Sequence, residues 1–317
     1  VGFSSFMRSV VPRNSKRIAV VYSPGLGGAW LSALAGATHE SQHEFVHIAI
    51  GDIGQDLSAA IGTEKSPIER ISYRGHKDVL CAAIGVWGVL RKNKINHIHT
   101  HGHEATAIGL IVARILGIDD RTYTRHHSTQ NYEGGPRYAH YYDRLANRLA
   151  TSIIATSAVV KECLIDREHV DETKIRMQSY RLDLGRFRGV EELRSRRIRE
   201  SYEISDDAYV VGMVSRLVWL KGVEYGVQAF RQFRERVPNA VLLLAGAVGP
   251  WMPVVKRELD TLPANSYRVV PFERDVAALY KVFDLVMHLP VSRGIEAWGQ
   301  VYIEALAAGT PLVCTES

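Results

Sequence analysis

The segment Ser292-Arg-Gly-Ile-Glu-Ala-Trp-Gly-Gln-Val-Tyr-Ile-Glu-Ala-Leu-Ala-Ala-Gly-Thr-Pro-Leu-Val313 carries two carboxylates, Glu296 and Glu304, eight residues apart. Glycines flank Glu296 and predict a loop there. Residues 301–308 are good helix formers, and Gly309 after them is typical of a helix C-terminus. Both carboxylates can therefore face one ligand at the N-terminus of this helix. Two solvated glutamates fit the spacing equally well.

Composition places the chain among ordinary globular proteins of about two domains, with 317 residues, 46% hydrophobic and 23% charged. The net charge of +5 favours phosphorylated ligands or an anionic membrane surface. The three cysteines are far apart and form no C-x-x-C, so we expect a reducing compartment and no zinc cluster. Residues 1–17 show no signal-peptide pattern, and the apolar run 79–90 is too short to span a bilayer. These features predict a cytoplasmic protein.

In the first half, apolar runs alternate with helical periodicity. Strands are predicted over 17–22, 44–50, 121–124 and 152–156, and helices over 78–92, 105–116 and 141–149. This βαβα order predicts a parallel sheet covered on both faces. Residues 52–73 are predicted to form a loop.

A glycine-rich turn, Ser23-Pro-Gly-Leu-Gly-Gly-Ala-Trp30, follows the first predicted strand. Glycine lets the backbone approach an anion closely, so Gly27 and Gly28 are candidates for phosphate contact. Trp30 stands where the dinucleotide-binding fingerprint requires a third glycine. A plain tight turn explains the pattern equally well.

Histidines are concentrated in two places. Four of them alternate over His97–His103 and would share one face of a strand. A metal site is one interpretation, and histidines that point into a cleft from the end of a strand are the other. His126 and His127 follow another predicted strand, at the carboxyl end where open α/β sheets bind ligands.

The domain boundary is predicted after a last strand-like piece, residues 174–184. It divides the chain into residues 1–184 and 185–317. Six arginines crowd the connector that follows: Arg186, Arg188, Arg194, Arg196, Arg197 and Arg199. A solvated surface explains them, and contact with anionic lipid is the functional alternative.

The second half repeats the α/β pattern, with strands predicted over 209–214, 241–246, 267–272 and 285–290. Arg216 and Lys221 flank the turn between the first of these strands and its helix. Two cations beside a helix N-terminus suit a diphosphate. We expect the ligand in a cleft between two similar α/β layers.

The ordered set of motifs resembles the family 4 retaining glycosyltransferases, which have the GT-B fold of two Rossmann-like domains with parallel sheets that face a cleft. The matching pieces are Gly212-Met-Val-Ser-Arg-Leu-Val-Trp-Leu-Lys-Gly222, the E-x7-E motif Glu296-Ala-Trp-Gly-Gln-Val-Tyr-Ile-Glu304, Ile98-His-Thr-His101 and Thr124-Arg-His-His127. The resemblance runs from about Arg17 to the end of the sequence.

The resemblance implies that Arg216 and Lys221 hold the donor diphosphate and stabilise the leaving group, so no metal is expected. Gly27 and Gly28 would bring backbone N–H groups to the same phosphates. Glu304 would bind the nucleotide ribose.

For the transferred sugar, the resemblance implies contacts from Glu296 and from the backbone amides at Trp298 and Gly299. His126 is our choice for the contact near the transferred carbon, with His127 as its rival. Glu296 and His126 are therefore the expected catalytic residues.

The implied reaction moves a hexose from a nucleotide-diphosphate sugar, with UDP as the expected carrier, to an acceptor hydroxyl with retention of configuration. No further cofactor is expected. The acceptor would be a saccharide or a lipid-linked sugar in polysaccharide, lipopolysaccharide or glycolipid synthesis, with peripheral contact at the inner face of the cell membrane. No nucleic acid is expected, because the basic residues lack interleaved aromatics.

Two departures from the family pattern leave alternatives open. Tyr180-Arg-Leu-Asp183 replaces the usual Asn-Gly-Val-Asp turn, and the sequence stops where the family has further structure, so the second domain is expected to be incomplete. The alternatives are a non-catalytic nucleotide-binding fragment, and a GT-B phosphorylase or epimerase.

Overall fold

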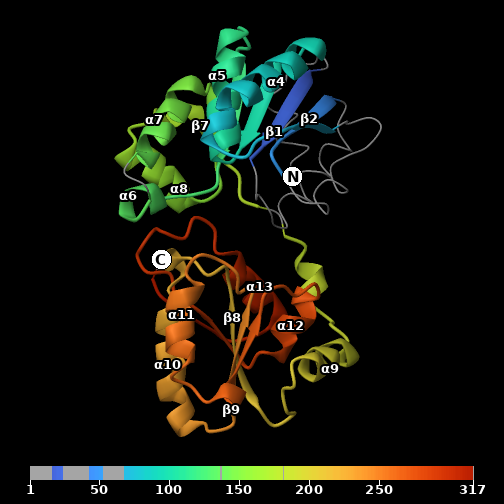
Figure 1. The fold of residues 1–317 in the computed structure, drawn as a ribbon, viewed down its shortest axis with the longest axis vertical. Coiled ribbons are helices and arrows are strands. Elements are labelled where there is room, and N and C mark those ends of the chain that lie inside the picture. The colour runs from blue at the N-terminus through green and yellow to red at the C-terminus, as the bar shows by residue number, and fades with distance from the viewer. Residues whose placement is uncertain (1–15, 24–42, 53–67, 136–137, 181, 317) are drawn as a thin grey trace. The chain divides into compact units, whose positions relative to one another are not determined.

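The computed structural model describes residues 16–23, 43–52, 68–135, 138–180 and 182–316 (Figure 1). The chain divides into two compact units, Val1–Leu182 and Asp183–Ser317. The division between the units therefore falls two residues before the boundary expected from the sequence. Each is described by itself below.

Unit 1 contains, within its described residues, a sheet of seven strands in the order β3-β2-β1-β4-β5-β6-β7, all paired in parallel. The central strands are almost completely buried. A parallel sheet of this kind is covered on both faces, so the side chains on both sides of its strands are apolar. The strands are β1 (Arg17–Tyr22), β2 (Glu44–Ile50), β3 (Ile68–Ile71), β4 (His97–His101), β5 (Asp120–Arg125), β6 (Ser152–Ala155) and β7 (Ile175–Met177).

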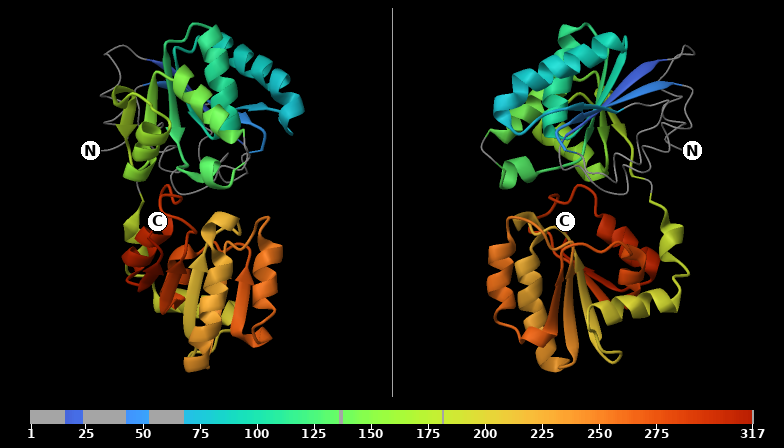
Figure 2. Two further views of the ribbon diagram at one scale, coloured as in Figure 1. Left: turned by 90° about the vertical axis from the view of Figure 1, so that its left-hand side faces the viewer. Right: turned by 45° about the vertical axis from the view of Figure 1, so that its right-hand side comes forward.

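Helix α5 (His103–Ile115) contacts α4 (Val79–Lys92) and α7 (Ala139–Leu149), so the three form one layer on the sheet (Figures 1 and 2). The short helix α6 (Gln130–Glu133) precedes α7. Helix α8 (Ala158–Glu162) continues into a π-helical turn, η2 (Cys163–Arg167). No helix in the described ranges combines the length and the apolar character needed to cross a bilayer.

Unit 2 contains a second parallel sheet, in the order β10-β9-β8-β11-β12. Alternate residues of its strands enter two apolar layers: Val210 lies in one cluster, and Val211 and Met213 lie in the other. The strands are β8 (Tyr209–Val214), β9 (Ala240–Ala245), β10 (Tyr267–Val270), β11 (Leu285–His288) and β12 (Leu312–Cys314), and the helices are α9 (Glu192–Ser201), α10 (Val223–Arg236), α11 (Met252–Leu259), α12 (Val276–Val282) and α13 (Gln300–Ala308).

The predicted parallel α/β architecture is confirmed in both units, and four local expectations were wrong. Strand β3 lies within the segment expected to be a loop, because its Ile-Glu-Arg-Ile sequence at the sheet edge lacks a continuous apolar run. The piece expected over 174–184 is a strand only at Ile175–Met177. Helix α11 was not predicted. His103 begins α5 and therefore does not continue the strand that holds the other histidines.

One glycine sets the turn that carries Lys221. Gly222 follows the 3-10 turn η5 (Trp219–Lys221) and has a φ of +57°, in the left-handed region. A Cβ at this position would lie 2.2 Å from the carbonyl oxygen of Leu289, just after strand β11. The turn after β8 can therefore approach β11 closely only because residue 222 has no side chain.

We expect Gly222→Ala to destabilise unit 2 more than Gly189→Ala, which offers a matched control with a φ of +64° and open space around the added Cβ. Both changes incur the left-handed penalty of about 1–2 kcal/mol. The clash at residue 222 should cost roughly 1–3 kcal/mol more. Urea unfolding curves measure the difference, and equal losses would contradict the close approach of the two segments.

Candidate functional site

The candidate donor site of unit 2 lies at the carboxyl edge of its sheet. Strands β8 and β11 are parallel neighbours, so the segments that leave their carboxyl ends emerge side by side. The first segment carries Arg216 and Lys221, and the second leads to Glu296 and helix α13. This is the edge at which open α/β sheets bind ligands.

Glu296 is the centre of a three-residue contact in this site. Its Oε2 atom lies 2.9 Å from His288 Nε2 and also forms an ion pair with Lys221 Nζ. The Glu296 side chain is only 9% exposed. Both of these contacts involve Oε2, so they leave the Oε1 atom of Glu296 unused.

The electrostatics of Glu296 follow from these contacts. Burial by itself would raise the pKa of the carboxyl, but the hydrogen bond with His288 and the charge of Lys221 lower it below its ordinary value of 4.5. Glu296 is therefore ionised at neutral pH and can only accept hydrogen bonds.

His288 is a residue of this site that received no role from the sequence. It ends β11 with its side chain buried, and its ring packs edge-on against Tyr302 of α13 at a centroid distance of 5.1 Å. A Cβ on Gly299 would lie 2.1 Å from the Tyr302 ring. Gly299 thus leaves room for Tyr302, which in turn packs against the histidine that holds Glu296. The sequence signal that could have identified His288 is its place at the end of a predicted buried strand.

Glu304 has a different environment. It is buried in α13, where Gln300 Nε2 donates a hydrogen bond of 2.7 Å to its Oε1 atom. Burial raises the pKa of this carboxyl, and the hydrogen bond offsets only part of that effect. Glu304 thus differs from Glu296, whose pKa lies below its ordinary value.

Arg216 is the exposed cation of the site. Its side chain reaches solvent at the carboxyl end of β8, and it has no ion pair with any residue that the structure describes. Lys221, in contrast, is already paired with Glu296. Gly27 and Gly28 lie outside the described residues.

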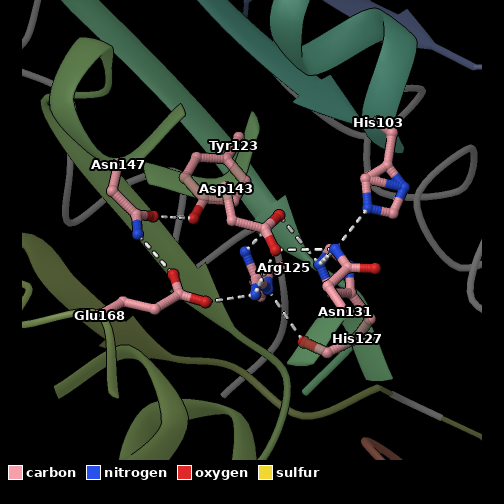
Figure 3. A network of polar contacts seen from close by, with 8 residues as sticks. All are labelled: His103, Tyr123, Arg125, His127, Asn131, Asp143, Asn147 and Glu168. Atoms are coloured by element: carbon pink, nitrogen blue, oxygen red, sulfur yellow. Dashed lines mark hydrogen bonds and ion pairs between the residues drawn. The ribbon is translucent and has the colours of Figure 1, made fainter. Parts of the chain in front are cut away.

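Unit 1 contains a buried charge network at the end of β5 (Figure 3). Arg125 lies 2.7 Å from Asp143 of α7 and 2.6 Å from Glu168, which follows the π-helical turn. The side chains of all three residues are at most 4% exposed. The Arg125 Nε–H also donates to the carbonyl oxygen of His127 at 3.0 Å. The network thereby fixes the backbone that carries the two candidate histidines.

The two histidines point to different partners. His126 Nε2 lies 3.0 Å from His101 Nδ1, and its Nδ1 atom contacts the Tyr180 hydroxyl. His127 Nε2 lies 3.0 Å from Asp143 Oδ1. Burial lowers the pKa of each histidine to about 3, so both rings are uncharged at neutral pH. The choice between them as the sugar contact remains a prediction.

One group of side chains in unit 1 has the composition of a metal site. Ligand atoms of His103, His127 and Asp143 all lie within 4.8 Å of one another. However, the amide nitrogen of Asn131 lies 2.7 Å from Asp143 Oδ2, 3.1 Å from His127 Nε2 and 3.3 Å from His103 Nε2 (Figure 3). The amide thus donates to Asp143 Oδ2 and lies within hydrogen-bond distance of both imidazole nitrogens.

The motifs and the fold agree with a known family. Residues 12–179 match the family model described as Glycosyltransferase Family 4, and residues 194–317 match the model described as Glycosyl transferases group 1. The first match alone covers more than half of the chain. The protein belongs to glycosyltransferase family 4, and its fold is that of the GT-B enzymes.

Individual relatives support the same assignment. The chain is 26% identical over 269 residues to alpha-monoglucosyldiacylglycerol synthase of Acholeplasma laidlawii, which covers 78% of this chain and 65% of the synthase. Anabaena HepE, solved in complex with UDP and glucose, is similar with a TM-score of 0.79, 20% identity and coverage of 94% and 80%. UDP-GlcNAc 2-epimerase of Methanocaldococcus jannaschii has a TM-score of 0.64 at 16% identity, with coverage of 94% and 83%. The chain thus spans just under two thirds of the synthase.

We expect Arg125→Met to destabilise unit 1 by roughly 3–5 kcal/mol, because two buried carboxylates would lose their cation. Arg91→Met, on the exposed surface of α4, is the matched control and should change stability little. Chemical denaturation followed by circular dichroism measures both variants. Similar small losses would contradict the role given to the network.

We expect Glu296→Gln to lower the stability of unit 2 at neutral pH by roughly 1–3 kcal/mol. Because the fold lowers the pKa of Glu296, its ionised form stabilises the fold above the ordinary pKa of 4.5, and this contribution declines as the pH falls through the lowered value. The difference from the wild type should therefore shrink in acid. Urea unfolding curves at neutral and at acidic pH test this. Glu235→Gln is the control, because Glu235 is exposed on α10. A deficit independent of pH would contradict it.

Proposed function

We propose that the protein is a retaining glycosyltransferase that moves a hexose from a nucleotide-diphosphate sugar to an acceptor hydroxyl. The observation that carries the proposal is the Lys221–Glu296–His288 contact, with Arg216 beside it at the same sheet edge. It combines cations for a diphosphate with an ionised acceptor for sugar hydroxyls. Membership of family 4 supports the same chemistry.

In the proposed reaction, the bond between the sugar C1 and the diphosphate oxygen breaks, and a bond from C1 to the acceptor oxygen forms on the same face. The acceptor proton passes to the leaving phosphate. Arg216 and Lys221 stabilise the charge that develops on the diphosphate, so the reaction requires no metal. UDP is the proposed carrier; UDP occurs in the complex of Anabaena HepE.

The two glutamates have separate proposed roles. Glu304, buried in α13, accepts hydrogen bonds from the nucleotide ribose. Glu296, ionised and held by His288, accepts hydrogen bonds from the sugar that is transferred. The backbone amides at Trp298 and Gly299 complete the sugar contacts. His126, with His127 as its rival, is the proposed contact near the transferred carbon.

The acceptor is a saccharide or a glycolipid. This part of the proposal is supported by relatives such as the synthase of Acholeplasma laidlawii, named for a glycosylated diacylglycerol. The proposed location is the cytoplasmic face of the cell membrane.

We expect Glu304→Ala to raise KM for the donor with little change in kcat, and Glu296→Ala to lower kcat. The loss of a hydrogen bond to a charged group predicts changes of about tenfold to a hundredfold. Steady-state kinetics with UDP-hexoses and a pool of lipid and saccharide acceptors measure both variants. Glu235→Ala is the control that should retain both constants, since Glu235 is exposed on α10.

Product analysis distinguishes the proposal from its rivals. A transferred hexose of unchanged anomeric configuration, formed also in the presence of EDTA, supports it. An epimerised sugar nucleotide, phosphate-dependent cleavage of a disaccharide, or nucleotide binding without turnover would each assign a different function. Equal kinetic effects of the two alanine variants would contradict the division of roles.

A further inference from the structure

The imidazole of His126, the residue after strand β5, has a protein partner at each ring nitrogen. Its Nε2 atom lies 3.0 Å from His101 Nδ1, and its Nδ1 atom contacts the Tyr180 hydroxyl. The His126 and Tyr180 rings are also stacked, with their centroids 6.0 Å apart and their planes 12° from parallel. Rotation of the imidazole by half a turn would put carbon atoms where both nitrogens now lie. The two contacts therefore favour one orientation of the ring.

The three side chains come from separate parts of unit 1. His101 is the last residue of β4, His126 follows β5, and Tyr180 lies beyond β7, close to the end of the unit. Tyr180 also begins the turn that departs from the family pattern. The backbone explains its place, because Gln178 N–H donates to the carbonyl oxygen of Ala155 at 2.9 Å. The segment after β7 thus continues beside the end of β6.

A backbone carbonyl gives these hydrogen bonds a direction. The hydroxyl of Thr156, the residue after β6, donates to the carbonyl oxygen of Arg125 at 3.1 Å, and a carbonyl can only accept. Thr156 is also a hydrogen-bonding partner of the Tyr180 side chain. Since the one proton of the Thr156 hydroxyl is used, Thr156 accepts from Tyr180. The Tyr180 hydroxyl has no second proton, so it accepts from His126 Nδ1.

The two histidines complete this chain of hydrogen bonds. Burial lowers the pKa of His126 to about 3 and that of His101 well below its ordinary value, so both rings are uncharged at neutral pH. An uncharged imidazole has one N–H, so with the proton on Nδ1 the Nε2 atom of His126 accepts from His101 Nδ1. The order of donors is then His101, His126, Tyr180 and Thr156, and the chain ends on the carbonyl oxygen of Arg125.

We propose that Tyr180 is a positioning residue for His126: it accepts the Nδ1–H of the ring, donates to Thr156, and so holds His126 in the Nδ1–H tautomer. In the proposed reaction, the chain of hydrogen bonds presents an uncharged ring to the sugar in one orientation. The sugar develops positive charge as its bond to the diphosphate breaks, and an imidazolium beside it would oppose that charge. This kinetic consequence rests on the proposed function, whereas the tautomer does not.

His127 provides an internal reference, because its partner requires the other tautomer. Its Nε2 atom lies 3.0 Å from Asp143 Oδ1. Burial alone would raise the pKa of Asp143, but the hydrogen bond with His127 and the charge of Arg125 lower it below its ordinary value. An ionised carboxylate can only accept, so His127 carries its proton on Nε2. Two histidines that are neighbours in sequence are thus expected in opposite tautomers.

NMR spectroscopy measures the tautomers directly. Long-range ¹H–¹⁵N spectra of the 317-residue chain, labelled with ¹⁵N-histidine, report which nitrogen of each imidazole carries the proton. We expect Nδ1–H for His126 and Nε2–H for His127 in the wild-type protein without any ligand. The variants His126→Gln and His127→Gln assign the two sets of signals.

Two variants test the direction of the chain of hydrogen bonds. Thr156→Val preserves the shape of the side chain but leaves the Tyr180 proton available to His126, so we expect His126 to change to the Nε2–H tautomer. Tyr180→Phe removes the acceptor, and we expect the Nδ1–H form to lose its dominance. Tyr209→Phe is the matched control, because Tyr209 lies at the start of β8, at the opposite end of that strand from the donor site. Melting curves establish that each variant is folded.

Steady-state kinetics test the consequence for the proposed reaction. With UDP-hexoses and a pool of lipid and saccharide acceptors, we expect Tyr180→Phe to lower kcat about tenfold with little change in the donor KM. A loss of this size corresponds to one hydrogen bond that matters only in the transition state. Tyr209→Phe should retain both constants.

Three results would overturn the proposal. The first is an Nε2–H tautomer of His126 in the folded wild-type protein. The second is an unchanged Nδ1–H tautomer in folded Thr156→Val and Tyr180→Phe. The third is a lower kcat in Tyr180→Phe with an unchanged tautomer, which would make Tyr180 a structural residue. Absence of hexose transfer by the wild-type protein would instead overturn the proposed function, while the NMR spectra would still decide the role of Tyr180.

Discussion

The buried ion pairs of Arg125 hold together the sheet edge of unit 1 that carries His126 and His127. Arg125 is the last residue of strand β5. Its guanidinium pairs with Asp143 of α7 and with Glu168, which follows the π-helical turn. Removal of a buried cation from two carboxylates costs far more than the net value of the pairs, because the anions stay desolvated. The backbone of His127 and helix α7 are therefore positioned by the same side chain. The network thus links the histidine edge to the helical layer.

Unit 2 also contains a carboxylate that is largely buried and paired with a cation. Lys221 and His288 converge on one carboxylate oxygen of Glu296, at the point where two parallel strands end. The ion pairs in unit 1 are fully buried and use both carboxylates, whereas the two side-chain contacts of Glu296 both involve its Oε2 atom. The pKa directions of Glu296 and Glu304 are opposite. The hydrogen bond with His288 and the charge of Lys221 outweigh burial at Glu296, whereas burial dominates at Glu304 despite its hydrogen bonds and the charge of Arg186. The two carboxylates, eight residues apart in sequence, thereby differ in chemistry.

Much of the fold was predictable because central parallel strands are continuous apolar runs, as in β1, β8 and β9, and because Gly309 ends its helix with a positive φ. Strand β3 was missed since an edge strand of mixed polarity has no such run. The partners of Arg125 and Glu296 were also missed. Asp143 lies 18 residues from Arg125 and Glu168 lies 43, and no local periodicity specifies which charges meet at such separations. His288 joined the site through the pairing of β8 with β11, which only the three-dimensional structure shows.

The packing of Gly299 against Tyr302 has an evolutionary consequence. A side chain at residue 299 would meet the tyrosine ring at 2.1 Å, so no larger residue can be accepted there while the ring is present. The ring also packs against His288, and its loss would leave the imidazole without that support. Substitution at either position thus changes which substitutions are tolerated at the other. We therefore expect His288, Gly299 and Tyr302 to tolerate substitution together rather than one at a time.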